Sequence, residues 1–171
     1  MAKVIIGFSK PTKFKLHAWI IEKIDGASFD HAYLRLTSSF LERDIIYQAT
    51  SKGVDFIGST LWLKNTRPVE EYELDITPDN YKTLIQFCID NAGVPYGFLG
   101  VFGAGIRKIV AKFGKTINNP FNDGLSSEFC SEIVTRCLDT IDPAQFDLNP
   151  DNITPNDLNI LLKKLNIKRI L

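Results

Sequence analysis

One cysteine and one histidine are the residues of this chain best suited to catalysis. Cys130 lies in the segment 126–134 (SSEFCSEIV), where a helix is expected to begin. A thiol in the first helical turn is close to unpaired backbone N–H groups and to the positive end of the helix dipole, which lower its pKa. His31 lies in a strand-like run, 29–34 (FDHAYL), and an imidazole can take a thiol proton and return it to a leaving group. The pattern predicts a partly accessible nucleophile, Cys130, with His31 as its base.

Cys130 also has a simpler interpretation. Free cysteine is among the most buried residue types, and Cys130 shares its helical face with Val134 and Cys137, as core residues do. Cys137 and Cys88 are both interpreted as inert core residues. His17, the other histidine, is interpreted as a packed or exposed residue of an earlier helix. Spacing alone leaves Cys130 open between a nucleophile and a core side chain.

A histidine base usually needs a third group that fixes its tautomer. Ile46, Gln48 and Thr50 share one face of the strand that follows His31. An antiparallel pairing of the two strands would place the amide oxygen of Gln48 beside a ring N–H of His31. The alternative interpretation is that Gln48 is a solvated strand residue.

Hydrophobic periodicity predicts an α+β chain, with strands mainly in the first half and helices before and after them. Helix starts are predicted where a hydroxyl precedes a proline, at Thr77–Pro78 and Thr154–Pro155, and Ser126 or Ser127 is expected to cap the helix of Cys130. The predicted strands are 4–8, 29–36, 45–49, 54–57 and 69–76, and the predicted helices are 13–24, 59–63, 78–91, 106–113, 127–141 and 155–165.

Composition narrows the functional classes. The chain has 171 residues, 20 of them basic and 20 acidic, so we expect one domain over 1–171 without the basic excess typical of nucleic-acid binding. Three cysteines are too few for a disulfide framework and favour a reducing compartment. No signal peptide or transmembrane segment is recognisable. We therefore expect a soluble protein, cytoplasmic or virion-associated.

Several short motifs do not meet the requirements of the sites they resemble. Gly114–Lys115–Thr116 lacks the first glycine of a phosphate loop, because Ile109 occupies that position. The cysteines and histidines do not have zinc-site spacing, and Asp147–Asp151 lacks the ligand pattern of a calcium loop. We expect no metal or cofactor. The glycine-rich segment 97–106 is interpreted as a connection packed on the core, or as an apolar lip of a substrate cleft or a lipid-contacting surface.

Five other segments, taken in chain order, resemble the NlpC/P60 superfamily, and specifically its circularly permuted branch of YiiX/YebB-like proteins. The resemblance covers about residues 4–162, and in this branch the histidine strand precedes the cysteine helix. The matching segments are Phe29–Leu34, Ile46–Thr50 with Gly53–Val54, Pro95–Phe98, Phe129–Val134 and Ile153–Leu158. Gln48 departs from the pattern, because the family commonly has a glutamate there.

The resemblance implies a papain-like core, in which a helix bearing Cys130 packs on an antiparallel sheet bearing His31 and Gln48. It implies a cysteine hydrolase that cleaves an amide or peptide bond through an acyl-cysteine, with Tyr96 lining the substrate cleft. The implied substrates are peptides, peptidoglycan or acyl groups. A lipid or acyl-protein thiol hydrolase or acyltransferase, and a non-catalytic binding module that retains the fold, are the alternatives. The sequence leaves the oligomeric state open.

Overall fold

The computed structural model describes residues 2–13, 26–38, 43–97, 110, 129–146 and 149–171. Three of the segments discussed above lie wholly or mostly outside these residues. They are the expected helix 13–24 with His17, the expected helix 106–113, and the glycine-rich segment 97–106 beyond Gly97.

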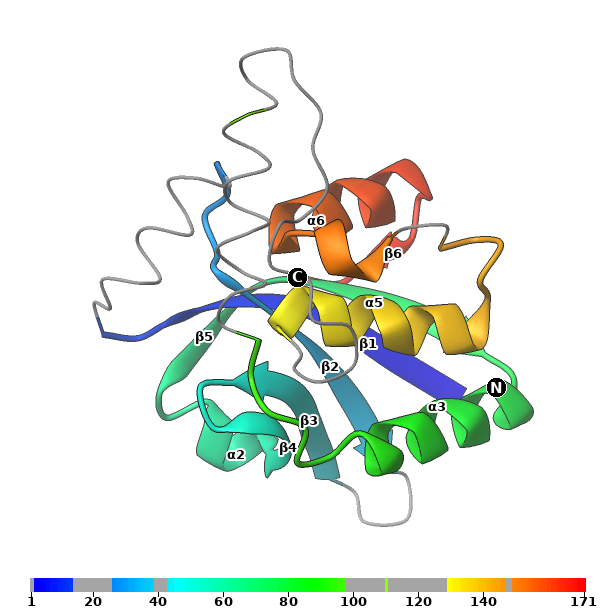
Figure 1. Ribbon diagram of the computed structural model, residues 1–171, viewed down its shortest axis with the longest axis horizontal. Coiled ribbons are helices and arrows are strands. Elements are labelled where there is room, and N and C mark those ends of the chain that lie inside the picture. Colours follow the sequence, from blue (N-terminus) through cyan, green and yellow to red (C-terminus); the bar gives the residue numbers. More distant parts are fainter. Residues whose placement is uncertain (1, 14–25, 39–42, 98–109, 111–128, 147–148) are drawn as a thin grey trace.

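The centre of the fold is a six-stranded antiparallel sheet with the strand order β4-β3-β2-β1-β5-β6 (Figure 1). The strands are β1 (Ala2–Pro11), β2 (His31–Ser38), β3 (Arg43–Thr50), β4 (Gly53–Gly58), β5 (Thr66–Ile76) and β6 (Lys168–Arg169). The five strands predicted from hydrophobic patterning are confirmed, although β2 begins at His31, two residues later than expected. The short strand β6 was not predicted, because its two residues are exposed and polar and carry no periodic pattern.

Among the described residues, the helices with defined bounds are α2 (Ser59–Trp62), α3 (Pro78–Asp90), α5 (Cys130–Ile141), α6 (Pro155–Lys164) and the 3₁₀ turn η2 (Pro150–Asn152). Both predicted hydroxyl–proline starts are confirmed. The Thr77 hydroxyl accepts a hydrogen bond from the backbone N–H of Asn80 at 3.1 Å. Thr154 forms a reciprocal pair with Asp157, whose N–H donates to the Thr154 hydroxyl at 3.2 Å and whose carboxylate accepts from the Thr154 N–H at 3.1 Å.

The main core lies between one face of the sheet and helix α5, which lies between α3 and α6 (Figure 1). Along β2, Ala32 and Leu34 point into this core together with Ile133 and Val134 of α5. The alternate side chains of β2 turn to the opposite face, where Tyr33 packs on Trp62 of α2 with ring centroids 4.5 Å apart. The sheet therefore has two packed faces, and β2 contributes to both.

The predicted fold class is confirmed: this is an α+β protein in which an antiparallel sheet packs against helices, as in a papain-like core. Within the part of the chain that the structure describes, the longest helix is α3, at 13 residues. None of these helices has the length and apolar character needed to cross a membrane.

Candidate active site

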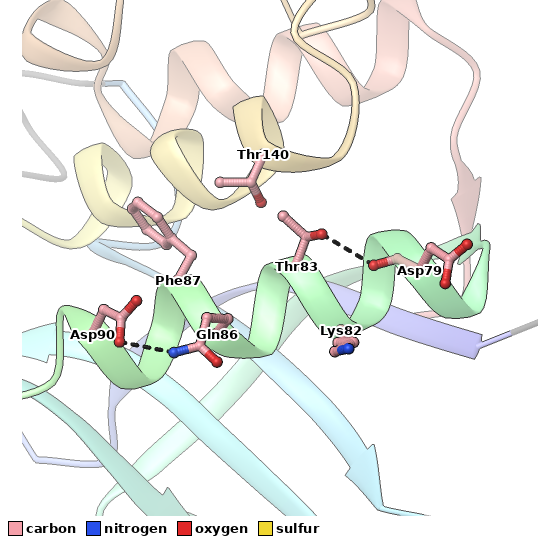
Figure 2. Close-up of a pocket in the computed structure, with 7 residues that line it drawn as sticks. All are labelled: Asp79, Lys82, Thr83, Gln86, Phe87, Asp90 and Thr140. Atoms are coloured by element: carbon pink, nitrogen blue, oxygen red, sulfur yellow. Dashed lines mark hydrogen bonds between the residues drawn. The ribbon is translucent and has the colours of Figure 1, made fainter.

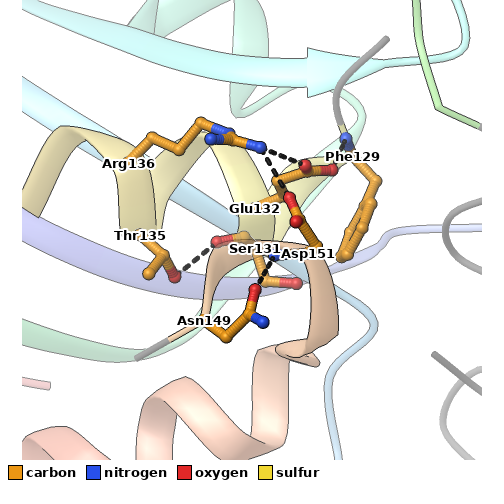
Figure 3. A network of polar contacts seen from close by, with 7 residues as sticks. All are labelled: Phe129, Ser131, Glu132, Thr135, Arg136, Asn149 and Asp151. Atoms are coloured by element: carbon orange, nitrogen blue, oxygen red, sulfur yellow. Dashed lines mark hydrogen bonds and ion pairs between the residues drawn. The ribbon is translucent and has the colours of Figure 1, made fainter. Parts of the chain in front are cut away.

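The helix that carries the candidate nucleophile begins directly at that residue. Cys130 is the first residue of α5, and the N-cap position is Phe129. The expected capping by Ser126 or Ser127 is therefore wrong. A phenylalanine side chain cannot accept a hydrogen bond. The helix start is capped instead by a residue of its own first turn, because the Glu132 carboxylate accepts a hydrogen bond from the Phe129 N–H at 3.4 Å (Figure 3).

A chain of ion pairs holds this helix start to the segment that follows the helix. Arg136 donates to the Glu132 carboxylate at 2.9 Å and to Asp151 at 2.6 Å (Figure 3). The Ser131 hydroxyl, also buried, donates to the carbonyl of Ile153 at 2.9 Å. Hydrogen bonds to charged groups in buried surroundings are among the stronger ones in proteins. The first turn of α5, which carries Cys130, is thus tied to the segment 151–153.

The thiol of Cys130 is more buried than the sequence predicted. The residue is 4% exposed, and burial raises the pKa of the thiol to about 12. The backbone N–H groups of Ala32, Ser131 and Cys130 itself act in the opposite direction, whereas the nearby Asp30 carboxylate raises the pKa further. The expectation of a partly accessible thiol with a lowered pKa is wrong in this structure, because desolvation outweighs the helix N-terminus.

The two other residues expected to support the thiol do lie together. The Nε2 atom of His31 is 3.0 Å from the amide oxygen of Gln48. The indole N–H of Trp62 donates to the same oxygen, also at 3.0 Å. Gln48 is 5% exposed, so it is a buried, hydrogen-bonded residue and the alternative of a solvated strand glutamine does not apply.

The thiol meets strand β2 one residue away from the histidine. The backbone N–H of Ala32 is near enough to lower the pKa of the thiol, and Ala32 directly follows His31, the first residue of β2. Helix α5 packs against β2 and β3, which are the strands that carry His31 and Gln48. The helix start and the histidine–glutamine pair therefore lie at the same end of β2, but Gln48 is bonded to Trp62 on the face of the sheet opposite α5.

Tyr96 belongs to the surroundings of the thiol. The residue is partly exposed, but burial around its hydroxyl raises its pKa well above the ordinary value, and the nearby Cys130 and Asp30 add to this shift. Asp30 is itself buried, at 9% exposure. Asp30 was not predicted as a site residue, and its place directly before His31 is the only sequence signal that could have indicated it.

The groove shown in Figure 2 is separate from these residues. It has a volume of about 530 Å³ and lies between α3 and the end of α5, lined by Asp79, Lys82, Thr83, Gln86, Phe87, Asp90 and Thr140. The polar residues of α3 that line it are exposed. It contains neither a cysteine nor a histidine, so we do not assign it to the candidate active site.

Comparison with known proteins supports the fold. No protein-family model matches the chain, and no curated protein matches it. Among solved structures, it is similar to the crystal structure of the metalloprotein YiiX from Escherichia coli O157:H7, with a TM-score of 0.56 and 12% sequence identity. The match covers 100% of this chain and 88% of that one. The chain therefore shares the YiiX-like α+β fold over its whole length, and at this identity the similarity concerns the fold alone.

Proposed function

We propose that this protein is a cysteine hydrolase that cleaves an amide or peptide bond, with Cys130 as nucleophile, His31 as base and Gln48 as the residue that orients the base. The observation that carries the proposal is the 3.0 Å contact between His31 Nε2 and the buried amide oxygen of Gln48. His31 directly precedes Ala32, the β2 residue whose backbone N–H lowers the pKa of the Cys130 thiol. Nucleophile, base and orienting group are the three parts that such a site requires.

The raised pKa of Cys130 determines how the reaction must begin. With a pKa of about 12, the thiol is protonated at neutral pH, so it needs a base at the moment of attack. In the proposed first step, His31 takes the thiol proton while the sulfur attacks the carbonyl carbon of the substrate. The tetrahedral intermediate then collapses, the C–N bond breaks, and the amine leaves with the proton from His31.

The second half of the proposed reaction regenerates the thiol. His31 takes a proton from water, and the resulting hydroxide attacks the thioester carbon. The C–S bond breaks, the carboxylic acid leaves, and the proton on His31 returns to the sulfur. These steps need no metal. The structural neighbour YiiX is described as a metalloprotein, but among the described residues of this chain no group of three or more His, Cys, Asp or Glu side chains could hold a metal ion.

Trapping of the acyl-enzyme tests the proposal and the substrate class together. The protein is incubated separately with a muropeptide library and with acyl lipids, quenched in acid, and examined by intact-protein and peptide mass spectrometry. We expect an adduct on Cys130 with the muropeptides. The adduct should be absent in Cys130→Ala and retained in Cys88→Ala, a matched control in which a buried core thiol is removed.

The two arms of this experiment separate the alternatives. An adduct on Cys130 with the lipids alone would leave the mechanism in place and change the substrate to a lipid or acyl group. Adduct formation that survives in Cys130→Ala, or the lack of an adduct with both substrate classes, would contradict the proposed nucleophile.

The second candidate is a non-catalytic binding module, and the burial of Cys130 is the observation that favours it. A thiol that is 4% exposed packs as core cysteines do. Under this proposal, Cys130→Ala would keep the biological activity of the protein, whatever partner carries it. Loss of that activity in a variant that remains folded would favour the enzyme.

A further inference from the structure

The side chain of Gln48 is held at both of its ends. Its oxygen accepts from the Trp62 indole N–H at 3.0 Å and lies 3.0 Å from His31 Nε2. Its nitrogen donates to the carboxylate of Asp55 at 3.3 Å. Gln48 and Asp55 are directly opposite each other in the β3–β4 pairing, so this last contact follows from the register of the sheet.

The chemistry of these partners fixes the orientation of the amide. An indole N–H can only donate, and an ionised carboxylate can only accept. The amide oxygen must therefore face Trp62 and the amide nitrogen must face Asp55. Because the oxygen that faces Trp62 also faces His31, the Nε2 atom of His31 must be the donor. In the neutral ring, the proton is then on Nε2 and the basic lone pair is on Nδ1.

We propose that Trp62 and Asp55 are positioning residues of the active site. Together they hold the Gln48 amide in the one orientation that keeps His31 in its Nε2–H tautomer, with Nδ1 as the base. This inference deepens the proposed function and rests on it for the role of His31. Asp55 also places a carboxylate two hydrogen bonds away from the ring, whereas the resemblance to NlpC/P60 proteins places an acid at position 48 itself.

Two conservative variants remove these constraints without removing Gln48. Trp62→Phe keeps an aromatic ring against Tyr33 but deletes the indole N–H. Asp55→Asn keeps the shape of the side chain but can either donate or accept. Each variant removes one of the two constraints, so the orientation in which the NH₂ group faces His31, and with it the Nδ1–H tautomer, becomes more populated. The proton is then on the nitrogen that the reaction needs as a base.

The tautomer can be measured directly, without any substrate. The chain has two histidines, so a His17→Gln background leaves His31 as the only ring. Long-range ¹H–¹⁵N correlation spectra of this protein, labelled with ¹⁵N-histidine and recorded where the ring is neutral, distinguish the two tautomers. We expect Nε2–H in the background protein. In each single variant the ratio of Nε2–H to Nδ1–H should fall roughly tenfold, about the preference that one hydrogen bond supplies.

Matched variants and kinetics complete the test. Asp44→Asn changes an aspartate of the neighbouring strand β3, which pairs with Arg35 at 2.9 Å, and it should leave the tautomer unchanged. For the proposed reaction, Trp62→Phe should lower kcat about tenfold with little change in KM, because a positioning defect acts on the chemical step. Should Trp62→Phe fail to fold, Asp55→Asn carries the test alone.

The outcomes separate this inference from the proposed function. A neutral His31 ring with its proton on Nδ1 in the background protein would overturn the assignment. So would a ratio of Nε2–H to Nδ1–H that stays unchanged in Asp55→Asn and in the double variant with Trp62→Phe. An adduct on Cys130 combined with an unchanged tautomer would refute the role of Trp62 and Asp55 alone. The expected tautomer shift without any adduct would refute the hydrolase alone.

Discussion

Placing a glutamate at position 48 should destabilise this protein. In Gln48→Glu, a carboxylate oxygen replaces the amide nitrogen that now lies 3.3 Å from the Asp55 carboxylate. Two like charges at that separation repel by about 1 kcal/mol in water and by about 5 kcal/mol at an effective dielectric constant of 20. Because Asp55 is only partly buried, we expect a loss of about 1 to 3 kcal/mol at neutral pH.

The loss of stability in Gln48→Glu should also depend on pH, and this dependence is the more specific test of the repulsion by Asp55. Repulsion by Asp55 raises the pKa of the introduced carboxyl group in the folded protein above its ordinary value near 4.3, so the folded state binds more protons than the unfolded state. Stability then falls as the pH rises, from about 4 to about 6.

A double-mutant cycle isolates the contribution of Asp55. Urea unfolding is measured from pH 4 to pH 8 for the parent protein, Gln48→Glu, Asp55→Asn and the double variant. In the double variant the new amide at position 55 can donate to the new carboxylate at position 48, so the repulsion disappears. We expect a coupling free energy of about 1 kcal/mol or more at pH 7 and almost none at pH 4. A coupling free energy that is near zero at pH 7 would refute this reasoning.

Two further predictions concern the sheet and the thiol. A Cβ atom at Gly7 would lie 2.1 Å from Cζ of Tyr33, whereas one at Gly58 would meet nothing within 4 Å. In urea unfolding, Gly7→Ala should therefore cost about 1 to 3 kcal/mol and Gly58→Ala less than about 0.5 kcal/mol, and equal costs would contradict the packing of Tyr33 over Gly7. Because burial raises the pKa of Cys130 to about 12, iodoacetamide should label the folded protein slowly at pH 7 and about tenfold faster for each pH unit above it. Labelling of Cys130 at pH 7 as fast as in the urea-unfolded chain would show that the thiol is accessible and ionises readily.

The parts of the fold that were predicted correctly depend on local chemistry. A capping hydroxyl before a proline is sufficient to start a helix, and both Thr77 and Thr154 do so in the structure. Alternation along β2 was also sufficient to separate Ala32 and Leu34 from Tyr33, which pack on opposite faces of the sheet. These patterns need no knowledge of distant residues.

The predictions that were wrong depend on distant residues. Ser126 and Ser127 have the side chains of helix caps, but α5 begins at Cys130 and is closed by Glu132 from within the helix. The pKa of Cys130 was expected to be lowered, because the first helical turn is visible in the sequence. The burial that raises it comes from tertiary packing, which a motif does not reveal.

Of the two partners that orient Gln48, Asp55 follows from local sequence and Trp62 depends on a distant contact. The Ser51–Lys52 turn pairs Thr50 with Gly53. Two residues farther from the turn on each strand, Asp55 is therefore opposite Gln48. Gly53 has a φ of +106°, and a Cβ there would lie 2.8 Å from the carbonyl oxygen of Val94, so this turn depends on glycine. The acid behind Gln48 could therefore have been predicted from the turn alone. Trp62 could not, because it reaches Gln48 from α2, across a contact that only the folded protein creates. A hairpin register and one packing contact together determine which nitrogen of His31 carries the proton.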